Sequence, residues 1–250
     1  HYTLLTDYEG NSLRTFYIDK KGYIWFGTID GIYIFDPTDG KLSHYKHSRT
    51  DPFSLPNNSI WEISEDRQSN VWIGTYSGTL CYVNIDENNA FKTYHPQNSG
   101  LNHTPVSAFA EDQQYLWVGT EGGGINRMNK ATGEFSYITS ANSITSNNIK
   151  SLITDAGHNL WISTFMGGLD LYNVGRQKVT NFKHTKGAPH SLLVNDVRKT
   201  ILEGDSGMWV AYQYQKAEVS YFSFREESFT HFSLDSISNC LLYTSDAADE

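Results

Sequence analysis

Acidic residues recur at regular intervals along the chain and are the first candidates for chemistry. Each of five apolar segments ends in a carboxylate: Asp19, Asp66, Asp112, Asp155 and Glu203. Carboxylates can bind metal ions or transfer protons, but catalysis uses one or two that their surroundings set apart, rather than five equivalent ones. We therefore expect these acids to initiate turns, with a side-chain oxygen accepting a hydrogen bond from the backbone N–H two residues later.

The histidines and a glycine-rich segment suggest no catalytic or metal site. The histidines near predicted strand ends or in linkers are His44, His95, His103, His184, His190 and His231. Residues 121–124 read Glu-Gly-Gly-Gly, but no helix is predicted after them, and a phosphate cradle needs a helix N-terminus. We predict no catalytic residue, no metal site and no cofactor.

A tryptophan-centred segment returns five times. Residues 22–31 read Gly-Tyr-Ile-Trp-Phe-Gly-Thr-Ile-Asp-Gly, and related segments contain the other repeat tryptophans. The five are Trp25, Trp72, Trp117, Trp161 and Trp209. Their separations of 47, 45, 44 and 48 residues are typical of a propeller or a solenoid.

Each repeat is predicted to form four short strands joined by turns rich in Gly and Asp. No segment shows sustained helical periodicity, so we predict an all-β fold, a β-propeller of four-stranded antiparallel blades. The five repeats cover about residues 4–49, 50–96, 97–140, 141–186 and 187–239. The innermost strands are predicted near residues 13–19, 59–66, 106–112, 149–155 and 197–203. The five tryptophans are expected to be buried, because a large ring fills the space between neighbouring sheets.

The ends of the chain do not read as blades. Residues 1–3 resemble the outer strand of a preceding blade, so we expect the sequence to begin within a longer protein. Residues 240–250 match translated sequencing-adapter DNA and are expected to be a non-native tail. Without that tail, which holds three acids and no base, the net charge would be −6 rather than −9. An acidic chain argues against nucleic acid as a partner, and no apolar run is long enough to span a membrane.

The repeat frame resembles the two-component regulator propeller family. The frame Asp-x-x-Gly-x-Ile/Leu-Trp-Ile-Gly-Thr is carried by residues 19–28 and, less completely, by residues 155–164. Residues 54–58 and 191–195 resemble the family's Leu-x-x-Asn linker. The frame departs at Ser163, which replaces a glycine, and at Ala211 and Tyr212 in the fifth repeat.

The resemblance implies a function as well as a fold. Such repeats form the extracytoplasmic, periplasmic sensor part of hybrid histidine kinases, many of which respond to polysaccharide fragments. It implies that five blades are an incomplete arc of a seven-bladed ring. It also implies that the parent is a homodimer and adds further blades and a downstream sensor domain. The chain itself is then a non-catalytic, oligosaccharide-sensing module without membrane contact. The alternatives are a propeller lyase, which would need a His and a Glu converging at the channel mouth, and a protein-interaction scaffold.

The predicted ligand site lies where the second-to-third-strand turns and the linkers meet. Trp61 lies near the start of a first strand, where alternation would place it on the same face as Ile63. Alignment on the strand-end acid matches it to Thr15, Ala108, Ser151 and Lys199, so packing does not demand a large ring there. The predicted ligand-binding residues are Trp61, Tyr76, Glu121, Phe165 and Asp30. The alternatives are that Trp61 fills a gap between two blades and that the turn residues vary without functional consequence.

Overall fold

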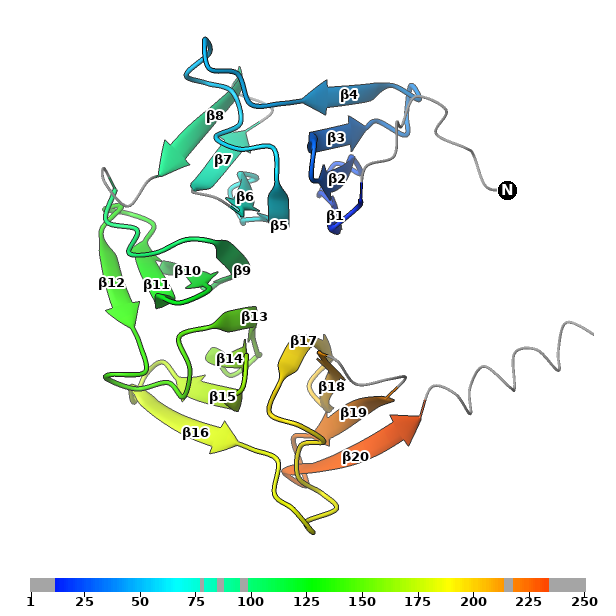
Figure 1. Ribbon diagram of the computed structural model, residues 1–250, viewed down its shortest axis with the longest axis vertical. Helices are drawn as coiled ribbons and strands as arrows, with labels where there is room; N and C mark the ends of the chain where they lie inside the picture. The colour runs from blue at the N-terminus through cyan, green and yellow to red at the C-terminus, as the bar shows by residue number, and fades with distance from the viewer. Residues whose placement is uncertain (1–11, 77–78, 85–87, 95–98, 214–217, 234–250) are drawn as a thin grey trace, which may run out of the picture. The chain divides into compact units, whose positions relative to one another are not determined.

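The computed structural model describes residues 12–76, 79–84, 88–94, 99–213 and 218–233. In this part of the chain, twenty strands form five four-stranded antiparallel sheets (Figure 1). Each sheet consists of four consecutive strands, and no described sheet combines strands from both ends of the chain. The predicted all-β propeller of four-stranded blades is confirmed. The predictions for residues 1–3 and 240–250 lie outside the described residues.

The chain divides into two compact units between Tyr137 and Ile138. The first unit holds three blades. The strands of its first blade are β1 (Thr15–Ile18), β2 (Ile24–Thr28), β3 (Gly31–Phe35) and β4 (Leu42–Tyr45). Those of the second are β5 (Ile60–Glu65), β6 (Val71–Thr75), β7 (Leu80–Asn84) and β8 (Asn88–Tyr94). Those of the third are β9 (Val106–Glu111), β10 (Tyr115–Thr120), β11 (Gly124–Asn129) and β12 (Phe135–Ile138).

The second unit holds the fourth and fifth blades. The strands of the fourth blade are β13 (Ile149–Thr154), β14 (Asn159–Thr164), β15 (Gly168–Asn173) and β16 (Lys178–Phe182). Those of the fifth are β17 (Val197–Glu203), β18 (Gly207–Tyr212), β19 (Glu218–Ser223) and β20 (Ser228–Ser233). The first strands β1, β5, β9, β13 and β17 agree with the predicted inner strands to within two residues at each end.

Within each unit, consecutive blades pack through their first strands. β5 contacts both β1 and β9 in the first unit, and β13 contacts β17 in the second. Hydrophobic clusters fill the space between neighbouring sheets, one between the first and second blades, one between the second and third, and one between the fourth and fifth. Burial between blades is therefore the main packing interaction, as in other propellers.

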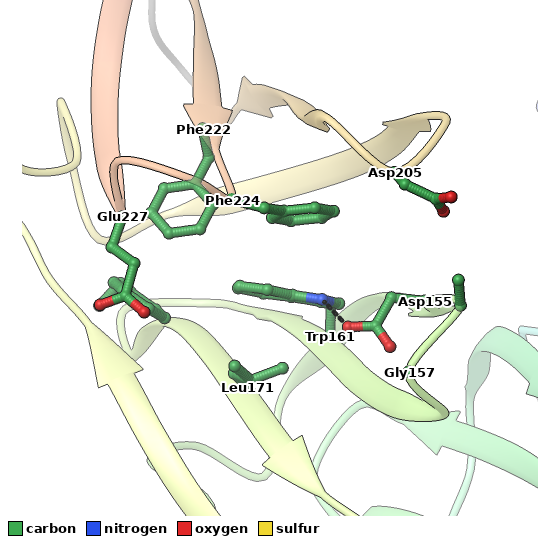
Figure 2. Close-up of a pocket in the computed structure, with 10 residues that line it drawn as sticks. Asp155, Gly157, Trp161, Leu171, Asp205, Phe222, Phe224 and Glu227 are labelled. Carbon is green, nitrogen blue, oxygen red and sulfur yellow. Dashed lines mark hydrogen bonds between the residues drawn. The ribbon is translucent and has the colours of Figure 1, made fainter.

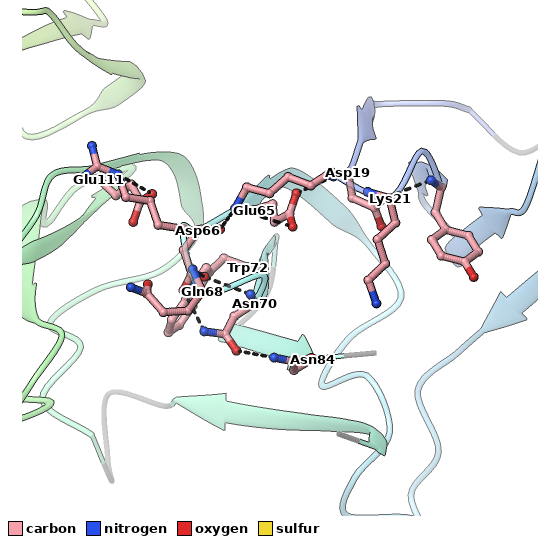
Figure 3. A network of polar contacts seen from close by, with 12 residues as sticks. Asp19, Lys21, Glu65, Asp66, Gln68, Asn70, Trp72, Asn84 and Glu111 are labelled. Atoms are coloured by element: carbon pink, nitrogen blue, oxygen red, sulfur yellow. Dashed lines mark hydrogen bonds and ion pairs between the residues drawn. The ribbon is translucent and has the colours of Figure 1, made fainter. Parts of the chain in front are cut away.

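The strand-end aspartates fix a turn and a tryptophan at the same time. Asp66 Oδ1 accepts hydrogen bonds from the N–H groups of Gln68 and Asn70, both at 2.9 Å, and Asp66 Oδ2 accepts one from Trp72 Nε1 at 2.8 Å (Figure 3). The same indole bond joins Trp25 to Asp19, Trp117 to Asp112 and Trp161 to Asp155 (Figure 2). The expectation of turn initiation is confirmed for Asp19, Asp66 and Asp112, and burial is confirmed for these four tryptophans.

The prediction that Trp209 is buried is wrong. Its side chain is 37% exposed, and its ring contacts Tyr221 and Phe232 of its own blade. Trp25, Trp72 and Trp161 belong to clusters that include residues of the following blade. Among the described residues no blade follows the fifth, so no neighbouring sheet covers the Trp209 ring. Glu203, which takes the place of the strand-end aspartate, makes no hydrogen bond with the indole.

The frame glycine two residues after the tryptophan lets the next blade approach closely. A Cβ atom on Gly74 would lie 2.7 Å from the backbone oxygen of Val106 in β9. In the fourth blade, Ser163 stands at this position and is fully buried, with its Oγ 3.3 Å from Thr200 Oγ1 of β17. Where serine replaces the frame glycine, its hydroxyl therefore forms a hydrogen bond with the next blade.

We expect Gly74→Ala to lower the free energy of unfolding by about 1–3 kcal/mol, because backbone atoms cannot move aside as a flexible side chain can. Urea denaturation measures this change. Ser163→Ala is the matched control and should lower it by no more than about 1 kcal/mol, the net value of one hydrogen bond. Equal effects of the two substitutions would contradict the close-approach argument.

A buried apolar residue anchors each linker that joins two of the described blades. These anchors are Leu55, Leu101, Ile144 and Leu192. In the third and fourth blades, the N–H of the next residue donates to a buried side chain of the third strand: Asn102 N to Asn126 Oδ1 and Thr145 N to Asp170 Oδ2, both at 2.8 Å. In the second blade, Pro56 follows the anchor and the buried third-strand residue is Cys81. Because proline has no N–H, an acceptor is not needed there.

Candidate functional site

Trp61 lies on a β-bulge at the start of β5. Ile60 pairs with Thr75 and Glu62 pairs with Gly74, which leaves Trp61 as an additional residue without a partner in β6. The expectation that Trp61 and Ile63 share one face is wrong, because the bulge interrupts the alternation. Ile60 and Ile63 are buried, whereas Trp61 and Glu62 are half-buried.

The same bulge occurs in three other blades and corrects the alignment of Trp61. The additional residues are Ser107 in β9, Lys150 in β13 and Arg198 in β17. The predicted matches Thr15, Ala108, Ser151 and Lys199 are therefore displaced by one residue. Arg14 is the corresponding residue of the first blade, because it lies five residues before Asp19, as Trp61 lies five before Asp66. Counting from the acid would have revealed this in the sequence.

Trp61 and Tyr76 form a stacked pair with Arg14. The ring centroids of Trp61 and Tyr76 are 5.4 Å apart at an interplanar angle of 26°. The guanidinium carbon of Arg14 lies 5.3 Å from the Trp61 ring and 6.0 Å from the Tyr76 ring. Arg14 Nη1 also donates a hydrogen bond to Ser59 Oγ at 3.0 Å. The structure thus brings two of the predicted residues together and adds an arginine that the sequence analysis missed.

Backbone hydrogen bonds hold this cluster where the turn and the linker meet. Tyr76 N donates to Ser59 O at 2.9 Å, and Gly31 N donates to Asn58 O at 2.8 Å. Tyr76 is 52% exposed. The Nε1 atom of Trp61 is buried and has no hydrogen-bond partner among the described residues. The cluster therefore presents an exposed aromatic surface beside a positive charge.

Asp30 belongs to a separate polar group in the first blade. Its Oδ2 forms an ion pair with Lys46 Nζ at 2.6 Å, and its backbone oxygen lies 2.8 Å from His44 Nε2. Neither of these contacts involves Trp61. Asp30 therefore lies in the same unit as the aromatic cluster but outside it.

Glu121 lies on the turn that follows β10 and is half-buried. Its N–H donates to Pro105 O at 3.0 Å. The ring of His103 lies against this turn, since a Cβ atom on Gly122 would be 2.8 Å from His103 Cε1. A histidine is thus placed beside the turn that carries Glu121, which the sequence analysis did not anticipate.

Phe165 occupies in the fourth blade the place that Tyr76 has in the second. Its N–H donates to Asn148 O at 3.0 Å, and Lys150 Nζ from the bulge lies 5.5 Å from its ring centroid. In both blades, the bulged residue therefore lies next to the aromatic residue that follows the second strand. Because Phe165 belongs to the second unit, its placement across one mouth from Trp61 stays a prediction.

The described residues contain no group of three or more His, Cys, Asp and Glu side chains placed to hold a metal ion. No helix in the described part of the chain is long and apolar enough to cross a membrane. The Trp61 cluster can stack against a flat, partly apolar ligand and can pair with an anion. It does not pair a nucleophile with a base.

Comparison with known families supports the resemblance seen in the repeats. Residues 7–30 and 54–77 match the family described as two component regulator propeller. A relative in Formosa agariphila named histidine kinase P4 is 27% identical over 201 residues, which cover 74% of this chain and 14% of the relative. The predicted resemblance to two-component regulator propeller repeats is confirmed.

Two similar solved structures come from Bacteroides thetaiotaomicron. The extracellular domain of the putative hybrid two component system BT3049 has a TM-score of 0.75 at 20% identity, over 90% of this chain and 28% of that chain. The extracellular domain of system BT4673 has a TM-score of 0.74 at 23% identity, over 91% of this chain and 31% of that chain. At these identities the structures establish the fold, and the chain spans less than a third of each protein.

Proposed function

We propose that the chain is a ligand-sensing propeller segment of an extracytoplasmic, periplasmic sensor in a hybrid two-component histidine kinase, and that its ligand is an oligosaccharide. The observation that carries the proposal is the exposed Trp61–Tyr76 stack on the face formed by turns and linkers. Sugar rings present an apolar face that packs against aromatic side chains, while a few polar groups fix their orientation. The segment itself catalyses no reaction.

The basic residues beside the aromatic rings favour an acidic oligosaccharide. Arg14 lies over both rings of the stack, and Lys150 lies over Phe165 in the fourth blade. A guanidinium binds a carboxylate with two parallel hydrogen bonds, which a neutral sugar cannot accept with equal strength. The predicted ligand therefore contains a uronic acid or a comparable anionic sugar.

Signalling in this proposal is a shift between conformations that already exist. A ligand changes such an equilibrium only by binding one arrangement more tightly than the other. In the parent protein, further blades, a downstream sensor domain and a second copy of the chain would supply those arrangements. The histidine kinase activity belongs to that parent.

We expect Trp61→Ala to weaken binding of an oligogalacturonate by about 1–3 kcal/mol, the value of burying one aromatic side chain. Isothermal titration calorimetry with the whole chain measures this, with a neutral cello-oligosaccharide of the same length as the comparison ligand. Arg14→Gln should weaken binding of the uronate and leave binding of the neutral sugar unchanged. Tyr76→Phe should change neither, because the ring remains.

Arg176→Gln serves as the matched charge control, since Arg176 is exposed and lies on a turn of the fourth blade. Urea denaturation of each variant separates loss of binding from loss of folding. Unchanged affinity of a folded Trp61→Ala variant would remove Trp61 from the site and favour its alternative role in filling a gap between two blades.

A lyase is the second candidate, and the position of His103 beside the Glu121 turn is the observation that favours it. Incubation of the chain with oligogalacturonate should release no unsaturated product, measured by its ultraviolet absorbance. Product formation that disappears in His103→Ala would replace the sensor proposal with the enzyme. A protein-interaction scaffold would instead bind neither sugar.

A further inference from the structure

A cavity of about 310 Å³ lies between the fourth and fifth blades, both within the second unit (Figure 2). Its walls are largely aromatic, with Trp161 from β14, Phe182 from β16 and Phe224 from the turn after β19. The volume is near the lower end of the range for ligand pockets, which indicates a small occupant. The cavity shares no lining residue with the Trp61 cluster.

Aromatic rings that stack on one another form the wall of this cavity. Phe224 stacks on the indole of Trp161 with centroids 5.5 Å apart at 16° (Figure 2). Phe182 stacks on the same indole at 5.7 Å and 26°. The face of an aromatic ring carries partial negative charge, so it attracts cations.

Three carboxylates, those of Asp155, Asp205 and Glu227, and no basic side chain line this cavity. Asp155 is held by the indole N–H of Trp161 at 3.0 Å. Asp205 and Glu227 are exposed and form no ion pair with any described residue. Arg225, which follows Phe224 in the chain, is not among the lining residues.

In the first unit, ion pairs connect neighbouring blades beside the strand-end aspartates. There Lys20 forms an ion pair with Glu65 at 3.8 Å across the first and second blades, and Arg67 pairs with Glu111 at 3.6 Å across the second and third (Figure 3). The basic residue directly follows a strand-end aspartate, and the acid directly precedes the next strand-end acid. At these positions the fourth and fifth blades have Ala156 and Leu202. The basic residue that follows the strand-end aspartate in the first two blades is therefore absent beside this cavity.

We propose that this cavity binds a small organic cation, an alkylated or quaternary ammonium group. Aromatic faces and uncompensated carboxylates together attract such a group more strongly than an uncharged molecule of the same shape. A strongly hydrated inorganic cation would gain less from the aromatic walls, because its water shell separates it from the rings. The site is independent of the oligosaccharide site and of its proposed role.

Choline and its uncharged isostere 3,3-dimethylbutan-1-ol are the probes, because they differ in charge and share their shape. Calorimetric titration of the whole chain should show that choline binds about tenfold more tightly than the isostere. Phe224→Leu, which removes a ring and keeps apolar volume, should weaken choline about tenfold and the isostere about twofold or less. Binding should also change the fluorescence of Trp161.

The double variant Asp205→Asn, Glu227→Gln should weaken choline several-fold without any change to the aromatic walls. Glu226→Gln is the matched control, because Glu226 lies on the same turn, is exposed and does not line the cavity. Equal affinity for choline and the isostere, absence of saturable choline binding, or an unaltered affinity in the double variant would each overturn the proposal. If Phe224→Leu fails to fold, the double variant still decides the question.

Discussion

Replacement of Trp161 by alanine is expected to lower the free energy of unfolding by about 3–5 kcal/mol, the range for loss of a buried large aromatic side chain. The indole is 3% exposed and packs against Phe182, Phe222 and Phe224. The substitution also removes the donor that Asp155 Oδ2 accepts at 3.0 Å. Urea denaturation followed by circular dichroism measures the change.

Trp209→Ala is the matched control, because it removes the same side chain from the same repeat position. Trp209 is 37% exposed and makes no hydrogen bond with Glu203 in the described structure. Its loss should lower the free energy of unfolding by no more than about 2 kcal/mol, because part of the ring is already exposed to solvent and its removal leaves no enclosed cavity. Similar values for the two variants would contradict the argument that the following blade and the aspartate determine the role of the tryptophan.

Asp170→Ala is the second substitution for which we expect a large loss, about 2–4 kcal/mol. Asp170 is fully buried. It accepts hydrogen bonds from Thr145 N and Thr145 Oγ1, both at 2.8 Å, and from Asn181 Nδ2 at 2.6 Å. Without the carboxylate, these donors lose their acceptor inside the protein, and a buried donor without a partner is costly.

Cys81→Ala is the matched control. Cys81 occupies in the second blade the position that Asp170 has in the fourth, but no linker N–H there needs a hydrogen-bond acceptor. Cys81 is buried beside a linker whose anchor is followed by Pro56. Burial raises the pKa of the thiol, so Cys81 stays protonated and acts as a small apolar group. We expect a loss of about 1 kcal/mol from the vacated volume. If Cys81→Ala lowered the free energy of unfolding more than Asp170→Ala does, the third-strand side chain would not owe its effect to the hydrogen bond from the linker N–H.

Asp170 also predicts a pH dependence. Burial raises the pKa of its carboxyl above the ordinary value of 3.8, and the hydrogen bonds from Thr145 and Asn181 oppose this shift. The folded protein therefore holds this proton more tightly than the unfolded chain does. The resulting stability is fully present below pH 3.8 and is lost as the pH rises through the raised pKa.

Asp170→Asn isolates this contribution, because it removes the titrating group and leaves the other carboxylates in place. The free energy of unfolding of the natural chain, minus that of the variant, should fall as the pH rises from below 3.8 and then become constant. Urea denaturation at a series of pH values measures this difference. A difference that rises with pH would mean that the hydrogen bonds outweigh burial.

The sequence by itself determined the repeat, the type of its strands and the role of its frame residues. A turn-initiating aspartate and a tryptophan five or six residues later act through a local hydrogen bond and through burial, and both recur in the first four blades. The burial of Trp25, Trp72, Trp117 and Trp161 could therefore be predicted from one chain without a structure.

Only the tertiary structure decided which residues share a site. The bulge at Trp61 depends on how β5 pairs with β6, because two residues of one strand face one of the other. In the folded first unit, the guanidinium of Arg14 lies over the ring of Trp61. A one-residue displacement is invisible in the alternation of apolar and polar residues, which the bulge interrupts.

The neighbouring blade likewise decided what the repeat position alone could not. Trp209 occupies the frame position of Trp161, yet it is exposed because no described blade covers it. The cavity beside Trp161 is lined from the next blade by Phe222 and Phe224, and the ion pair found between blades of the first unit has no counterpart at Ala156 and Leu202. Whether a repeat tryptophan is buried, and whether a charge is paired, depends on residues about fifty positions away in the next repeat. The local sequence pattern therefore determines the strand and its turn but not the surface against which the strand packs.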